Sequence, residues 1–455
     1  MDLDWRDDQI EARFLNYVDG LSSCLGHADR VDPFLSYCTG LLLPGDRKSV
    51  EPMAARLRPD RTSATHQSLL HFVGYSPWDG EALLRSVREA VLPVLTKNEA
   101  IQAWIIDDTG FPKKGRHSVG VARQYCGQIG KQDNCQVAVS LSVATSRASL
   151  PVAWRLYLPE SWAEDPARRE KAKVPEGVQF ATKPEIALAQ LETALGEGIS
   201  PGIVLADSGY GHSGAFRDGI EALGLTYCVA VLSNELVWLP GMTPQVPTGN
   251  GQGRRPKRLR RAGDDAPVVQ IGKLAESLSD EAWQEVSWRE GVDKVLKSRF
   301  AALRVRSAQG DHRRSEARPE QWLLMEWPEE EDEPKKFWFS TLPAETSIKR
   351  LVYSAKLRWL IERDYRELKQ ELGLGHYEGR GWPGFHHHAA LCIAAYGFLV
   401  AERARIPPSA TKTARLVETA ALPESYRPRG GANPHPTSCS LVDCNGSTKN
   451  RGLAG

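Results

Sequence analysis

AIQAWIIDD, at residues 100–108, is a short apolar run that ends in two acidic residues, a pattern typical of a buried strand. A second run of the same kind, GIVLAD, occupies residues 202–207. Further strand candidates follow the first run, and a helix candidate, KPEIALAQLETALGEG, precedes the second. Strands in succession, followed by alternating strands and helices, predict a mixed α/β sheet with helices on both faces.

The chain on either side of this sheet divides into segments of different composition. The predicted segments are a helical N-terminal DNA-binding domain (1–95), the first part of the sheet core (96–231), a β-rich insertion (232–345), the C-terminal helices of the core (346–406) and a disordered tail (407–455). Apolar residues at three- and four-residue spacing indicate the N-terminal helices. Short strand-like runs containing Trp indicate the insertion, and an excess of Pro, Gly, Ser and Asn indicates the disordered tail.

Composition limits the class of protein. The 455 residues are 41% hydrophobic and 25% charged, with a formal net charge of +1, which is ordinary for a soluble protein. No apolar run approaches the ~20 residues that cross a bilayer, and the acidic N-terminus lacks the apolar part of a signal peptide. The scattered cysteines form no CxxC pair, which argues against a structural zinc site. We therefore expect a cytoplasmic protein with no membrane partner.

Basic residues gather in two stretches, at residues 47–61 and 254–261. A near-neutral protein that binds DNA must concentrate its Lys and Arg locally in this way. The second stretch is equally well explained as a solvated loop.

Two aspartates follow the strand candidates. Asp107 and Asp207 each end a predicted strand, and sites in open α/β folds are built at such strand ends. An acid after a strand more often only begins a turn, but two in one sheet favour a site. Asp108 is the alternative to Asp107. Because successive strand residues face opposite ways, only one of the two should reach the site.

A third acid is expected on the predicted helix at residues 347–372. Its buried stripe consists of Leu357, Ile361, Leu368 and Leu372. Glu362 lies beside that stripe and shares a face with Arg358 and Lys369, whereas Glu367 is about 140° away and Asp364 further still. An Arg–Glu pair four residues apart on a solvated helix, worth about 0.3–0.5 kcal/mol, is the simpler interpretation of this helix taken alone.

Three long motifs, in order along the chain, resemble the DDE transposases of insertion-sequence family 701. They are IIDDTGFPKKGRHSVGVARQYCGQIGKQDNCQVAVS, VLADSGYG and LRWLIERDYRELKQELGLGHYEGRGWPGFHHHAAL. The resemblance extends over residues 35–405 or so. It implies an RNase H-like catalytic core with a β-rich insertion between the second Asp and the Glu.

The resemblance assigns site residues by motif. Asp107 and Thr109 match D-x-T, and Asp207, Gly209 and Tyr210 match D-x-GY.

The third motif, Y-x2-R-x3-E-x6-K, is matched by Arg358, Glu362 and Lys369. Ala355 occupies the position of the motif's Tyr, so this chain has no residue there that could perform the role of that Tyr.

The implied catalytic and metal-binding residues are Asp107, Asp207 and Glu362. Two Mg²⁺ ions, for which Mn²⁺ would substitute, stabilise the attacking and leaving oxygens of an in-line displacement. Asp107 would hold both ions, and Asp207 and Glu362 one each. Without metal, these clustered acids should repel one another.

The residues expected to contact DNA are Arg358, Lys369, Lys113, Lys114 and Tyr210. Lys113 and Lys114 are assigned only because GFPKKG follows Asp107 closely, and such a pair is as often simply solvated.

The expected partner is double-stranded DNA, both transposon terminal inverted repeats and target DNA. Cutting two ends and joining them to one target requires two active sites, so we expect a homodimer in the DNA complex. A bacterial, nucleoid-associated location follows. Two alternatives remain open: an inactive or domesticated DNA-binding relative, and a carboxylate-pair hydrolase of another class such as a glycosidase.

Overall fold

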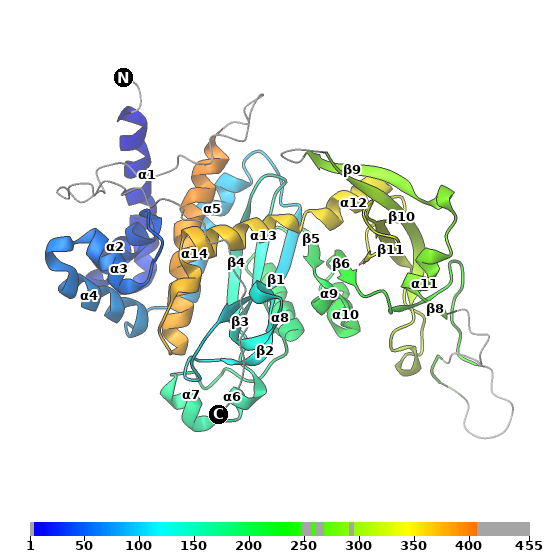
Figure 1. Ribbon diagram of the computed structural model, residues 1–455, viewed down its shortest axis with the longest axis horizontal. Helices are drawn as coiled ribbons and strands as arrows, with labels where there is room; N and C mark the ends of the chain where they lie inside the picture. The colour runs from blue at the N-terminus through cyan, green and yellow to red at the C-terminus, as the bar shows by residue number, and fades with distance from the viewer. Residues whose placement is uncertain (1–3, 248–256, 260–267, 291–294, 407–455) are drawn as a thin grey trace, which may run out of the picture.

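The computed structural model describes residues 4–247, 257–259, 268–290 and 295–406. The predicted tail at 407–455 and most of the basic stretch at 254–261 lie outside these residues. Within them, a 12-stranded mixed sheet has the order β2-β3-β1-β5-β6-β12-β11-β10-β7-β8, with β4 paired to β3 and β9 to β10 (Figure 1). The predicted mixed α/β class is confirmed.

The first half of the sheet contains the strands predicted around the two aspartates. Its strands are β1 (Ala103–Pro112), β2 (Ala122–Cys126), β3 (Lys131–Ala144), β4 (Ser149–Leu156), β5 (Ile203–Ala206) and β6 (Tyr227–Val231). β1 is antiparallel to β3 and parallel to β5, and β5 is parallel to β6. β3 is buried from Cys135 to Ala144, as expected for a strand covered on both faces.

The segment predicted as an insertion extends the same sheet. Its described strands are β7 (Leu236–Trp238), β8 (Val268–Gln270), β9 (Gln284–Glu290), β10 (Val295–Ser307), β11 (Gln321–Trp327) and β12 (Lys336–Ser340), with helix α11 (Ile271–Glu276). β12 pairs antiparallel with β6, from Phe337 opposite Val231 to Ser340 opposite Cys228. Backbone hydrogen bonds therefore join the two halves directly.

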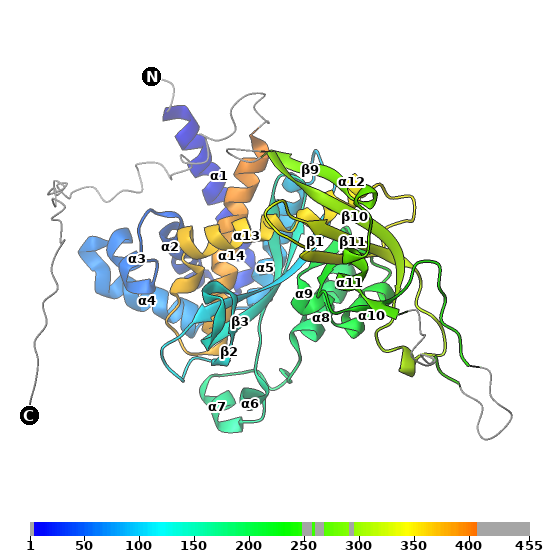
Figure 2. The same ribbon diagram turned by 45° about the vertical axis from the view of Figure 1, so that its right-hand side comes forward.

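Helices cover both faces of the first half. On one side lie α8 (Lys183–Gly196), α9 (Ser208–Gly211) and α10 (Gly214–Ala222), and the β4–α8 connection carries α6 (Glu160–Ala163) and α7 (Pro166–Lys171). On the other side, α13 (Trp359–Arg366) and α14 (Trp382–Arg405) cross the strands (Figure 2). α8 begins with a capping box in which Thr182 and Glu185 satisfy each other's backbone N–H groups.

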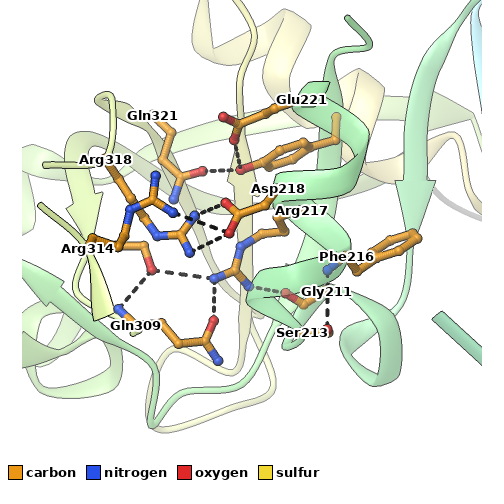
Figure 3. A network of polar contacts seen from close by, with 12 residues as sticks. Gly211, Ser213, Phe216, Arg217, Asp218, Glu221, Gln309, Arg314, Arg318 and Gln321 are labelled. Carbon is orange, nitrogen blue, oxygen red and sulfur yellow. Dashed lines mark hydrogen bonds and ion pairs between the residues drawn. The ribbon is translucent and has the colours of Figure 1, made fainter. Parts of the chain in front are cut away.

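A polar network ties α10 to the insertion (Figure 3). The Arg217 guanidinium donates to the Gln309 side chain at 2.8 Å. Asp218 accepts from Arg318, whose second amino group lies 3.0 Å from it. On β6, the Tyr227 hydroxyl donates to Gln321 of β11 at 2.7 Å. These contacts hold the part of the insertion that contains Gln309, Arg318 and Gln321 against the core.

The N-terminal helices pack around one long helix, α14 (Trp382–Arg405). They are α1 (Asp4–Ser22), α2 (Val31–Leu42), α3 (Val50–Leu57), α4 (Thr62–Gly74) and α5 (Gly80–Leu95). His387 of α14 contacts the carbonyls of Val73 and Trp78 and stacks on the Trp78 ring at 3.8 Å. α14 is long and apolar enough to cross a membrane, but 89% of its apolar window is buried inside the protein. It is a core helix.

The single helix predicted at 347–372 is wrong in one respect, because the structure breaks it. α12 (Ile348–Lys356) ends before Leu357, α13 (Trp359–Arg366) begins after Arg358, and a π-helical turn (Glu367–Glu371) follows. The break lets α12 follow β6, β9 and β10 while α13 crosses β1 and β4. The predicted buried stripe is confirmed, since none of its four residues is more than 4% exposed.

A candidate carboxylate site between the sheet core and the insertion

The parallel pairing of β1 with β5 brings the two aspartates together. The pairs are Ala103 with Ile203, Trp104 with Val204 and Ile105 with Leu205. Asp107 and Asp207 therefore both lie two residues past the last pair. Asp107 does not end its strand as the sequence suggested, because β1 continues to Pro112 along β3. It is the neighbouring strand β5 that ends here, after Ala206. Beside Asp107, the edge of β1 that β5 had covered is therefore open.

Asp207 is held by the start of the short helix α9. Its Oδ1 accepts hydrogen bonds from the backbone N–H groups of Gly209 at 2.9 Å and Tyr210 at 3.3 Å. A Cβ on Gly211 would lie 2.0 Å from the Ala230 carbonyl oxygen, so only glycine lets α9 approach β6 this closely. One carboxylate oxygen of Asp207 is thus oriented by backbone, and the other faces Arg358.

The three predicted acids surround one guanidinium. Nη2 of Arg358 lies 2.9 Å from Oδ1 of Asp107 and 4.0 Å from Oδ2 of Asp207. Nη1 of the same side chain lies 3.9 Å from Oε1 of Glu362. Arg358 and Glu362 therefore share the helix face that the sequence predicted. The pair is more than a surface contact, because Arg358 reaches the buried Asp107.

Burial distinguishes the three acids. The Asp107 side chain is 11% exposed, that of Asp207 44% and that of Glu362 72%. Burial raises the pKa of Asp107 to about 7, the charges of Asp207 and Asp108 add to this rise, and Arg358 opposes it. Burial works to lower the pKa of Arg358, but the surrounding carboxylates outweigh it and raise that pKa. Arg358 is a permanent cation at the centre of the cluster.

Asp108 points to the opposite face of the sheet. Its Oδ2 lies 2.8 Å from the Lys183 ammonium and accepts from the Tyr210 hydroxyl at 3.4 Å. Asp107 is thus the member of the pair that faces Arg358. The Tyr210 side chain is only 2% exposed. The sequence placed Tyr210 among the DNA contacts, whereas its position suits orientation of Asp108 and packing of α9.

Lys369 and Lys113 are each held by a backbone carbonyl. The Lys369 ammonium donates to the carbonyl of Gly110, three residues beyond Asp107, at 2.8 Å, and burial lowers its pKa to about 8. The Lys113 ammonium donates to the Tyr377 carbonyl at 2.9 Å, and burial lowers its pKa. Lys114 is exposed. Among the expected DNA-contacting residues, Arg358 alone forms an ion pair with the site acids in the described part of the chain.

The other acids of the Glu362 helix have partners elsewhere. Glu367 accepts from Arg403 at 2.6 Å. Asp364 is fully buried, where it accepts from the Tyr396 hydroxyl at 2.7 Å and from Ser149. The helix wheel placed Asp364 further from Glu362 than Glu367 is and did not predict its burial. Its position three residues after buried Ile361 was the available signal, since residues three apart lie on one helix face.

A cleft of about 600 Å³ lies beside the acids, where the core meets the insertion. We call it the carboxylate cleft. Its lining includes Asp207, Trp288, Lys335, Lys336, Trp338, Lys356, Arg358, Trp359 and Glu362. The sequence could not distinguish the tryptophans of the insertion. The structure places Trp288 and Trp338 at the cleft, while Trp283 and Trp327 pack on each other with ring centroids 5.3 Å apart.

The donor set suits a hard divalent cation, because every candidate ligand is a carboxylate oxygen. In the described residues, however, no group of three or more His, Cys, Asp and Glu side chains is arranged closely enough to hold a metal. The Arg358 guanidinium lies among the acids instead. The acids thus already accommodate positive charge, and cations binding there would compete with Arg358 for Asp107.

Comparison with known proteins gives two matches. A family model described as "DDE superfamily endonuclease" matches residues 20–295, more than half of the chain. A probable transposase for insertion sequence element IS701 from Microchaete diplosiphon is 38% identical over 172 residues, which cover 38% of this chain and 42% of that relative. The chain thus aligns with less than half the length of this curated relative. The family match includes Asp107 and Asp207 and ends before Glu362.

Proposed function

Because this chain belongs to the DDE superfamily endonucleases, we propose that it is an insertion-sequence transposase with catalytic residues Asp107, Asp207 and Glu362. The carrying observation is that all three carboxylates lie within 4.0 Å of the Arg358 guanidinium. These acids come from separate elements, and nothing in sequence spacing brings them together. Three carboxylates around one guanidinium carry excess negative charge, which is suited to binding further cations. Those cations would in turn allow an anionic substrate to approach.

The proposed catalytic core is RNase H-like. The topology supports this, with the order β4-β3-β1-β5-β6, antiparallel pairing among the first three strands and parallel pairing among the last three. The proposed catalytic acids then lie on the central strand, after its parallel neighbour, and on a helix that crosses the sheet.

Two Mg²⁺ ions, with Mn²⁺ as a substitute, would be held by Asp107 together with Asp207 and Glu362, and would stabilise charge on the attacking and leaving oxygens. The remaining roles belong to the chain itself. Asp207 is oriented by its contacts with α9, which leave its outer oxygen facing the cleft. Arg358, once its carboxylate partners are neutralised, is available to donate to a phosphate oxygen beside the scissile bond.

The proposed substrate is double-stranded DNA, first the terminal inverted repeats and then the target. The name of the matched relative supports an insertion-sequence origin. Lys335 and Lys336 bring positive charge to the mouth of the carboxylate cleft, with side chains 43% and 58% exposed. Lys113, Lys114 and Lys369 are proposed phosphate contacts along the β1 side.

The test is cleavage of duplex DNA that carries the ends of the element, with Mg²⁺, with Mn²⁺ and with a chelator. We expect cleavage with either ion and joining of the 3′-OH to a second duplex. Binding without cleavage under all conditions would favour an inactive DNA-binding relative. Hydrolysis of a glycoside without metal would favour the carboxylate-pair alternative.

The proposed working assembly is two protomers on two DNA ends. Light scattering at varied protein concentration, with and without end DNA, tests it. We expect a monomer or weak dimer without DNA and a dimer on paired ends. A tight dimer at nanomolar concentration without DNA would contradict this, because protein contacts would then drive assembly.

A further inference from the structure

Lys356 ends α12, just before the helix that carries Glu362, and its largely buried ammonium meets the insertion. We propose that Lys356 is a positioning residue: its ion pair with Glu326 sets Arg358 and Glu362 against Asp107. The positions of the catalytic helix and the insertion would then be coupled. The consequence for catalysis, though not the structural coupling, rests on the proposed nuclease function.

The geometry is that of an enclosed pair. The Lys356 ammonium lies 2.7 Å from both carboxylate oxygens of Glu326. The two side chains are only 15% and 3% exposed. Around the ammonium lie the rings of Trp288 at 4.3 Å, Trp338 at 5.5 Å and Phe300 at 5.6 Å. We call these five side chains the Lys356 cage.

The Lys356 cage draws on four strands of the insertion, β9, β10, β11 and β12, and on one helix. Phe300 and Glu326 are directly paired across β10 and β11. Trp288 packs edge-on against Phe300 with ring centroids 5.7 Å apart. Because these side chains are held by the sheet and by each other, the ammonium has one well-defined position.

The physical chemistry favours a positional role. Apolar contacts alone tolerate sliding, whereas an ammonium paired with both oxygens of one carboxylate specifies distance and direction. Aromatic faces add attraction for the cation. Burial lowers the pKa of Lys356, and Glu326 opposes that change. Removing Glu326 would leave the Lys356 ammonium largely buried and unpaired, which is strongly unfavourable. Removing Lys356 would leave the buried Glu326 carboxylate with only the Lys336 ammonium, at 3.9 Å.

Lys356 is placed where a small shift matters. It is the last residue of α12, and only Leu357 separates it from Arg358. At this joint the α-helical pattern changes to a tighter turn, in which the N–H groups of Leu360 and Ile361 donate to the carbonyls three residues earlier. Side-chain contacts at the joint therefore help to set the direction of α13. A displacement of ~1 Å in a catalytic group can cost on the order of 10²-fold in rate.

A direct DNA contact is the competing role for Lys356. The ammonium is committed to both oxygens of Glu326 and faces three rings, so a phosphate would have to displace a buried carboxylate. Lys335 and Lys336 line the same cleft with far more exposed side chains. These two are the better phosphate partners, and the position of Lys356 suits orientation.

The test compares Lys356→Met with the double variant Lys356→Met/Glu326→Leu. In both we expect the cleavage rate at saturating end DNA to fall about 10- to 100-fold. The divalent-ion concentration for half-maximal cleavage should rise, and DNA affinity should change less than about threefold. The double variant should recover much of the thermal stability lost in the single one, because no buried charge is left and Lys336, which also loses Glu326, is 58% exposed. Recovery of rate together with stability would overturn the positioning role.

Asp218→Asn is the matched control. It also weakens an ion pair between core and insertion, with Arg318, but at α10 rather than at the catalytic helix (Figure 3). It should lower thermal stability and leave the cleavage rate and the ion midpoint unchanged. If Asp218→Asn reduces the rate as much as Lys356→Met does, general loosening of the insertion explains both.

Hydrogen–deuterium exchange separates this inference from the proposed function, because it requires no activity. Backbone amides of residues 357–371 should exchange faster in the double variant than in wild type, whereas Asp218→Asn should leave them unchanged. If the amides exchange faster in the double variant but the wild-type protein cleaves no DNA, the positioning role is retained and the proposed nuclease function is rejected. Unchanged exchange in the double variant would reject the positioning role, whether or not the wild-type protein cleaves.

Discussion

Helix α13 carries carboxylates on two faces, and their surroundings are opposite. Glu362 faces the carboxylate cleft with a side chain 72% exposed, near Arg358 and two further acids. Asp364, two residues on, is fully buried and satisfied by Ser149 and Tyr396. Burial raises the pKa of Asp364 to about 7, as it does for Asp107. A raised carboxyl pKa therefore does not identify the candidate site. The candidate site is distinguished by three acids that converge on the Arg358 guanidinium beside the carboxylate cleft.

The largest effect should come from the cleft face. Asp107→Asn, Asp207→Asn and Glu362→Gln should each reduce DNA cleavage by at least about 10³-fold, because each removes a proposed metal ligand. Thermal stability and DNA affinity should change little. Cleavage assays of purified variants check this, with Glu367→Gln as the control, since Glu367 pairs with Arg403. Normal cleavage by Glu362→Gln and loss in Glu367→Gln would reverse the assignment of the helix face.

Substitution on the core face should affect stability instead. Asp364→Ala leaves two buried hydroxyls without their acceptor and creates a small void, for a loss of about 3 kcal/mol in the free energy of unfolding. The fraction of Asp364→Ala protein that remains folded should cleave DNA at close to the wild-type rate. Denaturant titration and a rate measurement below the unfolding transition test both statements. A strong loss of rate in well-folded protein would place Asp364 in the active site.

The same carboxyl predicts how stability depends on pH. Its pKa is raised on folding, so the folded state favours the protonated acid. That contribution is complete below the unfolded value near 4 and is lost as pH rises through about 7. We expect the free energy of unfolding to fall by roughly 4 kcal/mol over this window, since each pKa unit corresponds to about 1.4 kcal/mol. Asp364→Asn should make the free energy of unfolding depend less on pH. If the dependence is as steep in the variant as in wild type, other titratable groups cause it.

The smallest effect concerns the cations. Arg358→Ala should reduce the salt dependence of end binding by about one unit of slope, as expected for one lost phosphate contact. Lys369→Ala should change the slope less, because the Lys369 ammonium is already committed to the Gly110 carbonyl and its pKa is lowered to about 8. Binding isotherms at several salt concentrations measure both. Equal slopes for wild type and Arg358→Ala would leave Arg358 as a partner of the carboxylates alone.

The sequence by itself determined the features that depend on neighbours along the chain. Period-two and continuous apolar runs predicted the strands of the mixed sheet, and helical spacing predicted the stripe from Leu357 to Leu372. Motif resemblance selected Asp107 over Asp108, and the structure agrees that only Asp107 faces Arg358. The catalytic roles of these residues stay a prediction.

The tertiary structure alone decided what depends on pairing between distant segments. Examples are the joining of insertion and core through β6 and β12, the break after Lys356 in the helix predicted to carry Glu362, and the burial of Asp364. Each results from hydrogen bonds or packing between residues far apart in the chain, and only the burial of Asp364 had a local signal, its position three residues after Ile361. The position of Arg358 among three acids is of this kind. A helix wheel predicted that it shares a face with Glu362, but only the β1–β5 register brought the two aspartates to that face.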